Sequence, residues 1–203
     1  MTPYYQDGAV RIYCGDCRAI LPGVAFDVLV TDPPYPNNAG HFDDDVATAV
    51  EVLSGYEGRE ALVFWTELER PPVNLPLVAV HIWHRSNVNG RPYEPIYHFA
   101  ADGRKRRSCV GRFPAVFGGV GPGCNEFLGH PTQKPVCLMT WLLQMTEGCV
   151  CDPFCGVGAT IVAAHGLNRE AVGIEKQPDW AAAAARRMAQ GVLPLYAYRL
   201  KPG

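Results

Sequence analysis

The turn Asp32-Pro33-Pro34-Tyr35 places a carboxylate, a rigid backbone and an aromatic ring within four residues. The exocyclic amine of adenine or cytosine is a poor nucleophile, because its lone pair is delocalised into the ring. The Asp32 carboxylate and the Pro33 carbonyl could each accept one amino hydrogen and so favour a tetrahedral nitrogen. The two proline rings stiffen these acceptors in place, and Tyr35 could stack on the base. The turn predicts an amine-activating site, unless it merely ends a strand.

A second group of residues has the form of a nucleotide-binding turn. The stretch Asp152-Pro153-Phe154-Cys155-Gly156-Val157-Gly158 is followed by Glu175, 19 residues after Gly156. Glycines let the backbone approach a ligand, and the next helix start offers free amide groups. An acidic side chain at the end of the following strand can accept hydrogen bonds from ribose hydroxyls. An adenosine-type cofactor is predicted; a plain strand–helix turn is the alternative. A dinucleotide motif would need a glycine where Ile161 stands.

A run of basic residues is the candidate nucleic-acid surface. The formal net charge of the chain is -2, so contact with DNA would need a local patch of positive charge. A solvated surface loop is the competing interpretation of such a run. The residues that we assign to DNA binding are Arg104, Lys105, Arg106, Arg107 and Arg112.

Strands and helices must alternate along the chain to position these groups. Apolar and β-branched runs predict strands over 10–13, 26–31, 61–65, 77–83, 93–100, 149–151 and 171–174. Helical spacing predicts helices up to about residue 21 and over 44–55, 136–145, 159–165 and 179–190. Residues 102–129 show no lasting periodicity and are interpreted as loop or as a small subregion. The alternation predicts an α/β fold with a mostly parallel sheet, in which both motifs follow buried strands.

The order of the motifs resembles that of a known family. The catalytic Asp32 to Tyr35 comes first. His130-Pro131-Thr132-Gln133-Lys134-Pro135 then resembles a His-Pro-Thr-Glu-Lys-Pro signature, and Asp152 to Gly158 matches Asp-Pro-Phe-x-Gly-x-Gly. Over about residues 10 to 190 the chain resembles the β-type, circularly permuted DNA amino-methyltransferases of the N6-adenine/N4-cytosine family.

The resemblance implies a doubly wound, Rossmann-like fold, S-adenosyl-L-methionine as cofactor and double-stranded DNA with a flipped base as partner. It implies that Asp32, Pro33, Pro34 and Tyr35 are catalytic, and that Glu94 lines the base pocket. The remaining implied roles are cofactor contacts: Asp16 with the adenine amine, Thr132 and Lys134 with the methionine carboxylate, Asp152 with its ammonium, Phe154, Gly156 and Gly158 in the pocket wall and glycine turn, and Glu175 with the ribose.

Two features depart from the family pattern. Val157 and Ala159 stand where small hydroxyl residues are usual, so hydrogen bonds to the cofactor would be fewer. Only 101–129 remain as a small target-recognition subregion, so a short site, loose specificity or help from a second subunit in a homodimer would follow. An aspartate in the first motif position favours adenine N6 over cytosine N4, and restriction-modification is the expected setting. A non-catalytic nucleic-acid-binding protein on the same fold remains an alternative.

Size and composition set the remaining expectations. A chain of 203 residues fits one domain. Residues 1–8 lack a secretory signal and no apolar run could span a bilayer, so we expect a cytoplasmic protein without membrane contact. Eight cysteines are then expected to be reduced, and no metal is expected, because Cys14 and Cys17 lack a matching second pair. Residues 36–45 are expected to form a mobile loop at the site entrance.

Overall fold

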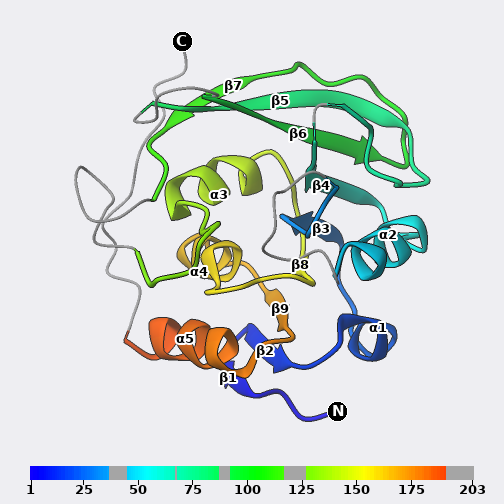
Figure 1. Ribbon diagram of the computed structural model, residues 1–203. Helices are drawn as coiled ribbons and strands as arrows, with labels where there is room; N and C mark the ends of the chain where they lie inside the picture. Colours follow the sequence, from blue (N-terminus) through cyan, green and yellow to red (C-terminus); the bar gives the residue numbers. More distant parts are fainter. Residues whose placement is uncertain (37–44, 67, 87–91, 117–126, 191–203) are drawn as a thin grey trace.

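A computed structural model describes residues 1–36, 45–66, 68–86, 92–116 and 127–190. Its framework is one nine-stranded sheet with the order β1-β2-β9-β8-β3-β4-β6-β5-β7, shown in Figure 1. The strands are β1 (Tyr5–Asp7), β2 (Val10–Cys14), β3 (Val28–Thr31), β4 (Glu60–Phe64), β5 (Leu77–Arg85), β6 (Tyr93–Ala100), β7 (Val110–Phe113), β8 (Val150–Asp152) and β9 (Ala171–Glu175).

The centre of the sheet is parallel and buried. Neighbouring strands pair in parallel from β2 through β9, β8 and β3 to β4. Every residue of β3, β8 and β9 is buried, because helices cover both faces of such a sheet and the strands become continuous apolar runs. The carboxyl ends of these five strands therefore meet at one edge, which we call the catalytic edge.

The rest of the sheet is mixed. Strand β6 runs antiparallel to both β4 and β5, and β7 pairs in parallel with β5. Consequently β6 starts at the catalytic edge and ends at the opposite edge, whereas β5 and β7 end at the catalytic edge. The paired residues Trp83 and Glu94 mark the point where β5 ends and β6 begins there.

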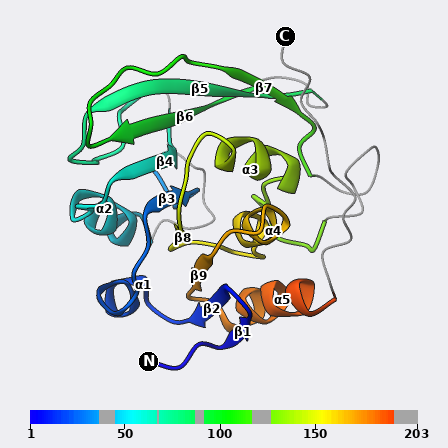
Figure 2. The same cartoon turned by 180° about the vertical axis from the view of Figure 1, so that it is seen from behind.

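Helices pack on both faces of the sheet, as Figures 1 and 2 show. One apolar core includes Leu138, Ile161 and Ala184, which come from three different helices. The core on the other face includes Ile20 and Leu53 from two more. The doubly wound, mostly parallel fold is confirmed. The helices are α1 (Cys17–Ile20), η1 (Leu21–Gly23, 3-10), α2 (Val46–Ser54), α3 (Val136–Leu143), α4 (Ala159–Gly166) and α5 (Pro178–Ala189).

Two short edge strands, β1 and β7, differ from the sequence-based interpretation. Strand β7 lies inside the segment that was interpreted as loop, and that interpretation is wrong for Val110–Phe113. Four residues are too few to show a period, and the strand is held by tertiary contacts. Trp83 Nε1 donates to the Phe113 carbonyl at 2.9 Å, and a side chain at Gly111 would collide with Trp141.

Some expectations fall partly beyond the described residues. Residues 37–44 of the expected entrance loop and 117–126 of the expected recognition segment lie outside them. In the part of the chain that the structure does describe, no helix has the length and apolar character needed to cross a membrane. The seven cysteines in this part are free thiols.

Candidate active site

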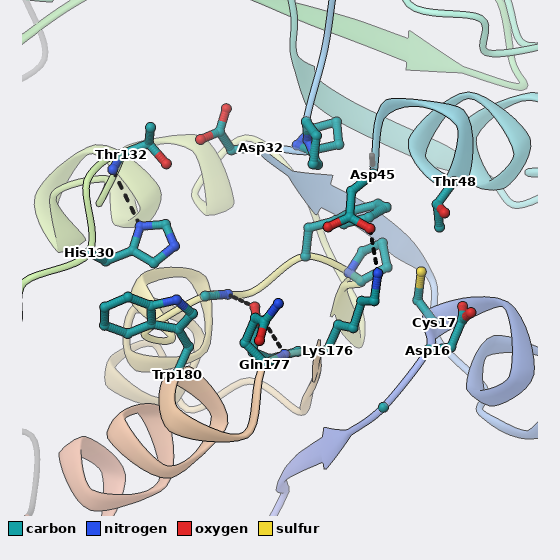
Figure 3. Close-up of a pocket in the computed structure, with 17 residues that line it drawn as sticks. Asp16, Cys17, Asp32, Asp45, Thr48, His130, Thr132, Lys176, Gln177 and Trp180 are labelled. Carbon is teal, nitrogen blue, oxygen red and sulfur yellow. Dashed lines mark hydrogen bonds and ion pairs between the residues drawn. The ribbon is translucent and has the colours of Figure 1, made fainter. Parts of the chain in front are cut away.

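A pocket opens at the catalytic edge, where the turns that follow β2, β3, β8 and β9 converge (Figure 3). Parallel α/β sheets bind ligands at this position, beyond the carboxyl ends of their strands. The proline turn and the glycine turn both line it, although about 120 residues separate them. Its lining is Gly15, Asp16, Cys17, Asp32, Pro33, Pro34, Asp45, Thr48, His130, Thr132, Pro153, Phe154, Gly156, Glu175, Lys176, Gln177 and Trp180.

Asp32 follows β3 directly and presents one oxygen without a partner. Its Oδ2 accepts a short hydrogen bond from Lys134 Nζ. Its Oδ1 is buried and has no hydrogen-bond partner among the residues described. Burial raises the pKa of the Asp32 carboxyl to about 6, and the positive charge of Lys134 opposes that shift. A buried polar atom without a partner is costly in a folded protein, and a ligand that pairs with it would remove the cost.

Tyr35 and Glu94 complete a polar cluster beside Asp32. The Tyr35 hydroxyl donates to Glu94 Oε1 at 3.4 Å, and the Tyr35 ring lies 5.7 Å from that of Trp65. Burial raises the pKa of Tyr35, so its hydroxyl is a neutral donor. The structure therefore brings Glu94, which starts β6, to the catalytic turn, as the resemblance implied. We call Asp32, Tyr35, Glu94 and Lys134 the catalytic cluster.

The position of Lys134 differs from that implied by the resemblance. Its ammonium contacts Asp32 and lies 3.4 Å from Glu94 Oε1. It does not line the main pocket but an adjoining cavity, together with Asp152 and Thr132. Thr132 lines both spaces. The His130–Pro135 segment thus faces the main pocket with one of its predicted ligands and the catalytic cluster with the other.

Asp152 ends β8 and is held by three donors. Its Oδ1 accepts from the Thr31 hydroxyl at 2.8 Å and from the Phe154 amide at 3.2 Å. Its Oδ2 accepts from the Thr160 hydroxyl at 2.5 Å. Burial raises the pKa of Asp152 to about 6 against these hydrogen bonds. Asp152 lines the adjoining cavity, so an ammonium group could reach it only from there.

The glycine turn and Glu175 are joined by hydrogen bonds. The Gly156 amide donates to Glu175 Oε2 at 2.9 Å, and the Gln177 amide donates to Oε1 at 2.7 Å. Glu175, Gly156 and Phe154 all line the main pocket. Gly158 lines neither space. It caps α4 with φ +79°, and a side chain there would approach Ala184 at 3.1 Å, so its role is in helix packing.

Asp16 lines the pocket at its α1 side (Figure 3). It caps α1 by accepting from the Arg18 amide at 2.9 Å, and its carboxylate pairs with the Arg18 guanidinium. These contacts lower the pKa of Asp16 to about 2. The side chain is thus a charged acceptor that is already partly used.

Several lining residues were missed by the sequence interpretation. Trp180 of α5 meets His130 edge to face at 4.9 Å, and Lys176 pairs with Asp45 at 2.6 Å, as Figure 3 shows. Lys176 and Gln177 directly follow Glu175, so the rule that ligands bind beyond strand ends could have found them. Trp180 has no such local signal, because only the tertiary fold brings α5 to the pocket. Asp45 was expected near the site entrance, as the last residue of the segment 36–45, and it lines the pocket.

The basic run that we assign to DNA binding lies away from the pocket. The turn before it is tied to the start of β4, since the Ala101 amide donates to the Arg59 carbonyl. Lys105 donates to the Leu77 carbonyl at the start of β5. Both contacts are at the edge opposite the catalytic one.

Individual members of the run also have different surroundings. Arg106 is held by Glu60 at 3.2 Å and by Asp102 at 3.3 Å. Arg104 and Arg107 are exposed. Arg112 is different, because it is exposed on β7, paired in register with His84 near the catalytic edge.

Comparisons with known proteins identify the family of the chain. A family model described as a DNA methylase of the N6/N4 type matches residues 69–186. The chain is 25% identical to the type II methyltransferase M.ScaI of Streptomyces caespitosus over 92% of its own length and 83% of that protein. It is 27% identical to the putative methylase YubD of Escherichia coli K12, over 88% of this chain and 90% of that one.

Solved structures share the fold. The complex of M1.HpyAVI with S-adenosylmethionine superposes with a TM-score of 0.68 at 20% identity, covering 88% of this chain and 98% of that one. The cytosine-N4-specific PvuII DNA methyltransferase gives 0.68 at 15% identity, covering 91% and 88%. The modification methylase TTHA0409 of Thermus thermophilus, in complex with S-adenosylmethionine, gives 0.63 at 20% identity, covering 91% and 95%.

The family match covers more than half of the chain and includes the His130–Pro135 segment and the glycine turn. The proline turn lies outside the matched residues, but the fold brings it to the same pocket. This chain belongs to the N6/N4 DNA methylase family.

Proposed function

We propose that this protein transfers a methyl group from S-adenosyl-L-methionine to the exocyclic amine of a flipped DNA base, with adenine N6 as the target. One observation carries the proposal. Asp32 Oδ1 is buried at the pocket without a hydrogen-bond partner in the described chain, while Oδ2 is fixed by Lys134. A rigidly held carboxylate with one open oxygen is what an amino hydrogen of a base would pair with.

The residues around the main pocket fit the proposed cofactor. Phe154 and Trp180 offer apolar surface for an adenosine group, and Glu175 and Asp16 place carboxylates where hydroxyl or amino donors could pair. Thr132 and the Gly156 backbone would line the amino-acid end, and Asp152 would face its ammonium from the adjoining cavity. When bound, S-adenosylmethionine supplies a methyl group already activated by its sulfonium.

The chain's own residues then act by alignment. Asp32 Oδ1 and the Pro33 carbonyl accept the two amino hydrogens, so that the nitrogen lone pair is directed out of the ring plane. Tyr35 and Trp65 offer aromatic surface to the base, and such stacking contributes about 1–3 kcal/mol toward the cost of flipping it. Asp32 is also placed to receive the proton that the nitrogen loses once it has gained a fourth bond.

The choice of adenine rests on the residue type at position 32. Adenine N6 and cytosine N4 present the same local amine, so the cluster could act on either. An aspartate there is more typical of adenine enzymes, and cytosine N4 is the alternative. Mapping of modified bases in the DNA of cells that express the protein, compared with cells that express Asp32→Asn, distinguishes the two. N6-methyladenine is the expected product; N4-methylcytosine would overturn the choice of base.

We place the DNA surface at the catalytic edge. Arg85 ends β5 with its guanidinium 5.8 Å from the Trp83 ring, and Arg112 is exposed on the neighbouring β7. Both strands end on the side where Glu94 meets the proline turn. Contacts with phosphates there would make binding salt-dependent. A second subunit in a homodimer would enlarge this small DNA-binding surface. Sedimentation of the protein with and without DNA measures whether a homodimer forms.

A non-catalytic DNA-binding protein is the second candidate. It would bind DNA and S-adenosylhomocysteine without transferring methyl groups. Transfer of labelled methyl groups to DNA by the purified protein, with none by Asp32→Asn, would exclude it. The unpartnered oxygen of Asp32 favours the enzyme, because a protein that only binds DNA has no need for a buried open acceptor.

A further inference from the structure

The Lys134 ammonium lies against two carboxylates and two aromatic rings. Its ammonium contacts Asp32 Oδ2 and lies 3.4 Å from Glu94 Oε1. It also lies 5.0 Å from the centre of the Phe64 ring and 5.9 Å from that of Trp83. Only 10% of its side chain is exposed. A cation so enclosed cannot exchange partners freely with solvent, so these contacts define its role.

Lys134 is not part of the lining of the main pocket, and the adjoining cavity that it does line is shared with Thr132, Asp152 and Gly156. Thr132 lines the main pocket together with Gly156 and Glu175, whereas Lys134 does not. Lys134 meets only the adjoining cavity, where Asp32 and Asp152 are the acidic neighbours. The resemblance assigned Thr132 and Lys134 to one ligand group. In the structure Thr132 lines both spaces, whereas Lys134 lines only the adjoining cavity and contacts Asp32.

The catalytic cluster would be unstable without a cation. The side chains of Asp32 and Glu94 are 17% and 12% exposed, and both lie against the Lys134 ammonium. Burial and the nearby carboxylate both disfavour the charged form of Asp32. Asp152 adds a third negative charge, and Tyr35 brings no compensating charge. Lys134 is the cation that contacts both Asp32 and Glu94 in the described structure.

We propose that Lys134 is a positioning residue of the base pocket that keeps Asp32 ionised and holds Asp32 and Glu94 in place, instead of a ligand of the methionine carboxylate. The inference rests on the proposed function in one respect: it takes the exocyclic amine of the base as the group that Asp32 binds. The electrostatic role itself belongs to the protein without cofactor or DNA, so it can be measured there.

The test is a carbon-13 NMR titration of the aspartate carboxyl carbons in the free protein, with the Asp32 signal assigned by its loss in Asp32→Asn. In Lys134→Met, the pKa of Asp32 should rise by about one to three units, the size of effect that a close opposite charge has. Lys134→Arg, which keeps the charge, should leave it near the wild-type value. Adding Glu94→Gln to Lys134→Met should reverse part of the rise, because one repelling carboxylate is gone.

Arg59→Met is the matched control. It removes a cation 3.4 Å from Asp27 at the exposed surface and should not move the Asp32 signal. S-adenosylhomocysteine, which carries the same amino-acid carboxylate as the methyl donor, is the binding probe. Calorimetry should give an affinity for Lys134→Met within about threefold of wild type, since loss of a direct charged contact would cost about tenfold or more.

Two results would overturn the inference: an Asp32 pKa that does not change in Lys134→Met, or a tenfold or greater loss of S-adenosylhomocysteine affinity. Both results are independent of DNA methylation by the wild-type protein. An inactive wild type would reject the proposed function while leaving the NMR result in place. If Lys134→Met does not fold, Lys134→Gln, which also removes the charge, gives the same comparison and should again raise the pKa of Asp32.

Discussion

Two buried polar clusters lie at opposite edges of the sheet, and they differ in how completely they are paired. At the catalytic edge, Asp32 keeps an oxygen without a partner. At the other edge, His81 and His98 form a chain with Glu60 that we call the distal cluster. His81 Nε2 lies 3.1 Å from His98 Nδ1, and His98 Nε2 lies 2.8 Å from Glu60 Oε1.

Every position of the distal cluster has a neighbour. The Cys109 amide donates to His81 Nδ1 at 3.2 Å, which makes His81 Nε2 the donor to His98 and leaves His98 Nε2 to donate to Glu60. Burial lowers the pKa of His81 to about 4, consistent with a neutral ring. Arg106 then pairs with Glu60. A saturated network stabilises the fold, whereas an unsaturated one is poised for a ligand.

Among substitutions in the two clusters, we expect the largest effect on catalysis when Asp32 is changed. Asp32→Asn should lower the rate of methyl transfer by about 100- to 1,000-fold, because it removes a preorganised acceptor from the amine. The affinity for S-adenosylhomocysteine should hardly change. Single-turnover assays with labelled methyl donor measure the rate, and calorimetry measures the affinity. Full activity in Asp32→Asn would show that catalysis does not need the open oxygen of Asp32, and the two clusters would then not differ in function.

Substitution in the distal cluster should lower the stability of the protein and leave catalysis unchanged. Glu60→Ala leaves the buried His98 N–H unpaired and should lower the free energy of unfolding by about 1–3 kcal/mol, with the single-turnover rate unchanged. Asp102→Ala is the matched control, since its exposed pair with Arg106 is screened by solvent and should contribute much less. Denaturant titration compares them. Equal losses for the two variants would show that the distal cluster is not a special source of stability.

Acid should inactivate the catalytic cluster before it unfolds the protein. Burial raises the pKa of Asp32 to about 6, so the carboxylate that accepts the amino hydrogen is lost as the pH falls through that value. Below about pH 6 the rate should drop about tenfold per pH unit. Rates at saturating cofactor and DNA, with circular dichroism at each pH, test this. A rate that is flat down to pH 4.5 would mean that Asp32 stays ionised or is not needed.

The smallest effect concerns the basic run. Combined substitution of Arg104, Lys105 and Arg107 by alanine should change DNA affinity by less than about threefold, since these residues lie at the edge opposite the pocket. Arg112→Ala should weaken binding more, and it should reduce the salt dependence by about one phosphate contact. Fluorescence anisotropy over a salt series measures both. The reverse order of effects would place the DNA at the other edge.

The fold was largely predictable because its central strands are continuous apolar runs. Continuous apolar runs such as 26–31 and 171–174 are typical of parallel strands buried on both faces, and β3 and β9 lie within them or extend them by one residue. Strand β7 was missed because its four residues are held by Trp83 and Trp141 rather than by their own pattern.

The site residues were predictable where they directly follow the carboxyl end of a parallel strand. The residues after β3, β8 and β9 reach one pocket because parallel strands bring their carboxyl ends together. Side-chain partners could not be foreseen in this way. The pairing of Lys134 with Asp32, across 102 positions of sequence, and the placement of the basic run depend on how β6 reverses direction. That reversal has no signature in local residue spacing.

The most direct test of the account is a methyl-transfer reaction with purified protein, S-adenosylmethionine and duplex DNA, followed by digestion and mass spectrometry of the nucleosides. The account predicts N6-methyldeoxyadenosine with the wild type and none above background with Asp32→Asn, while both proteins bind S-adenosylhomocysteine equally. A wild type that binds S-adenosylhomocysteine and DNA but yields no methylated nucleoside would contradict it.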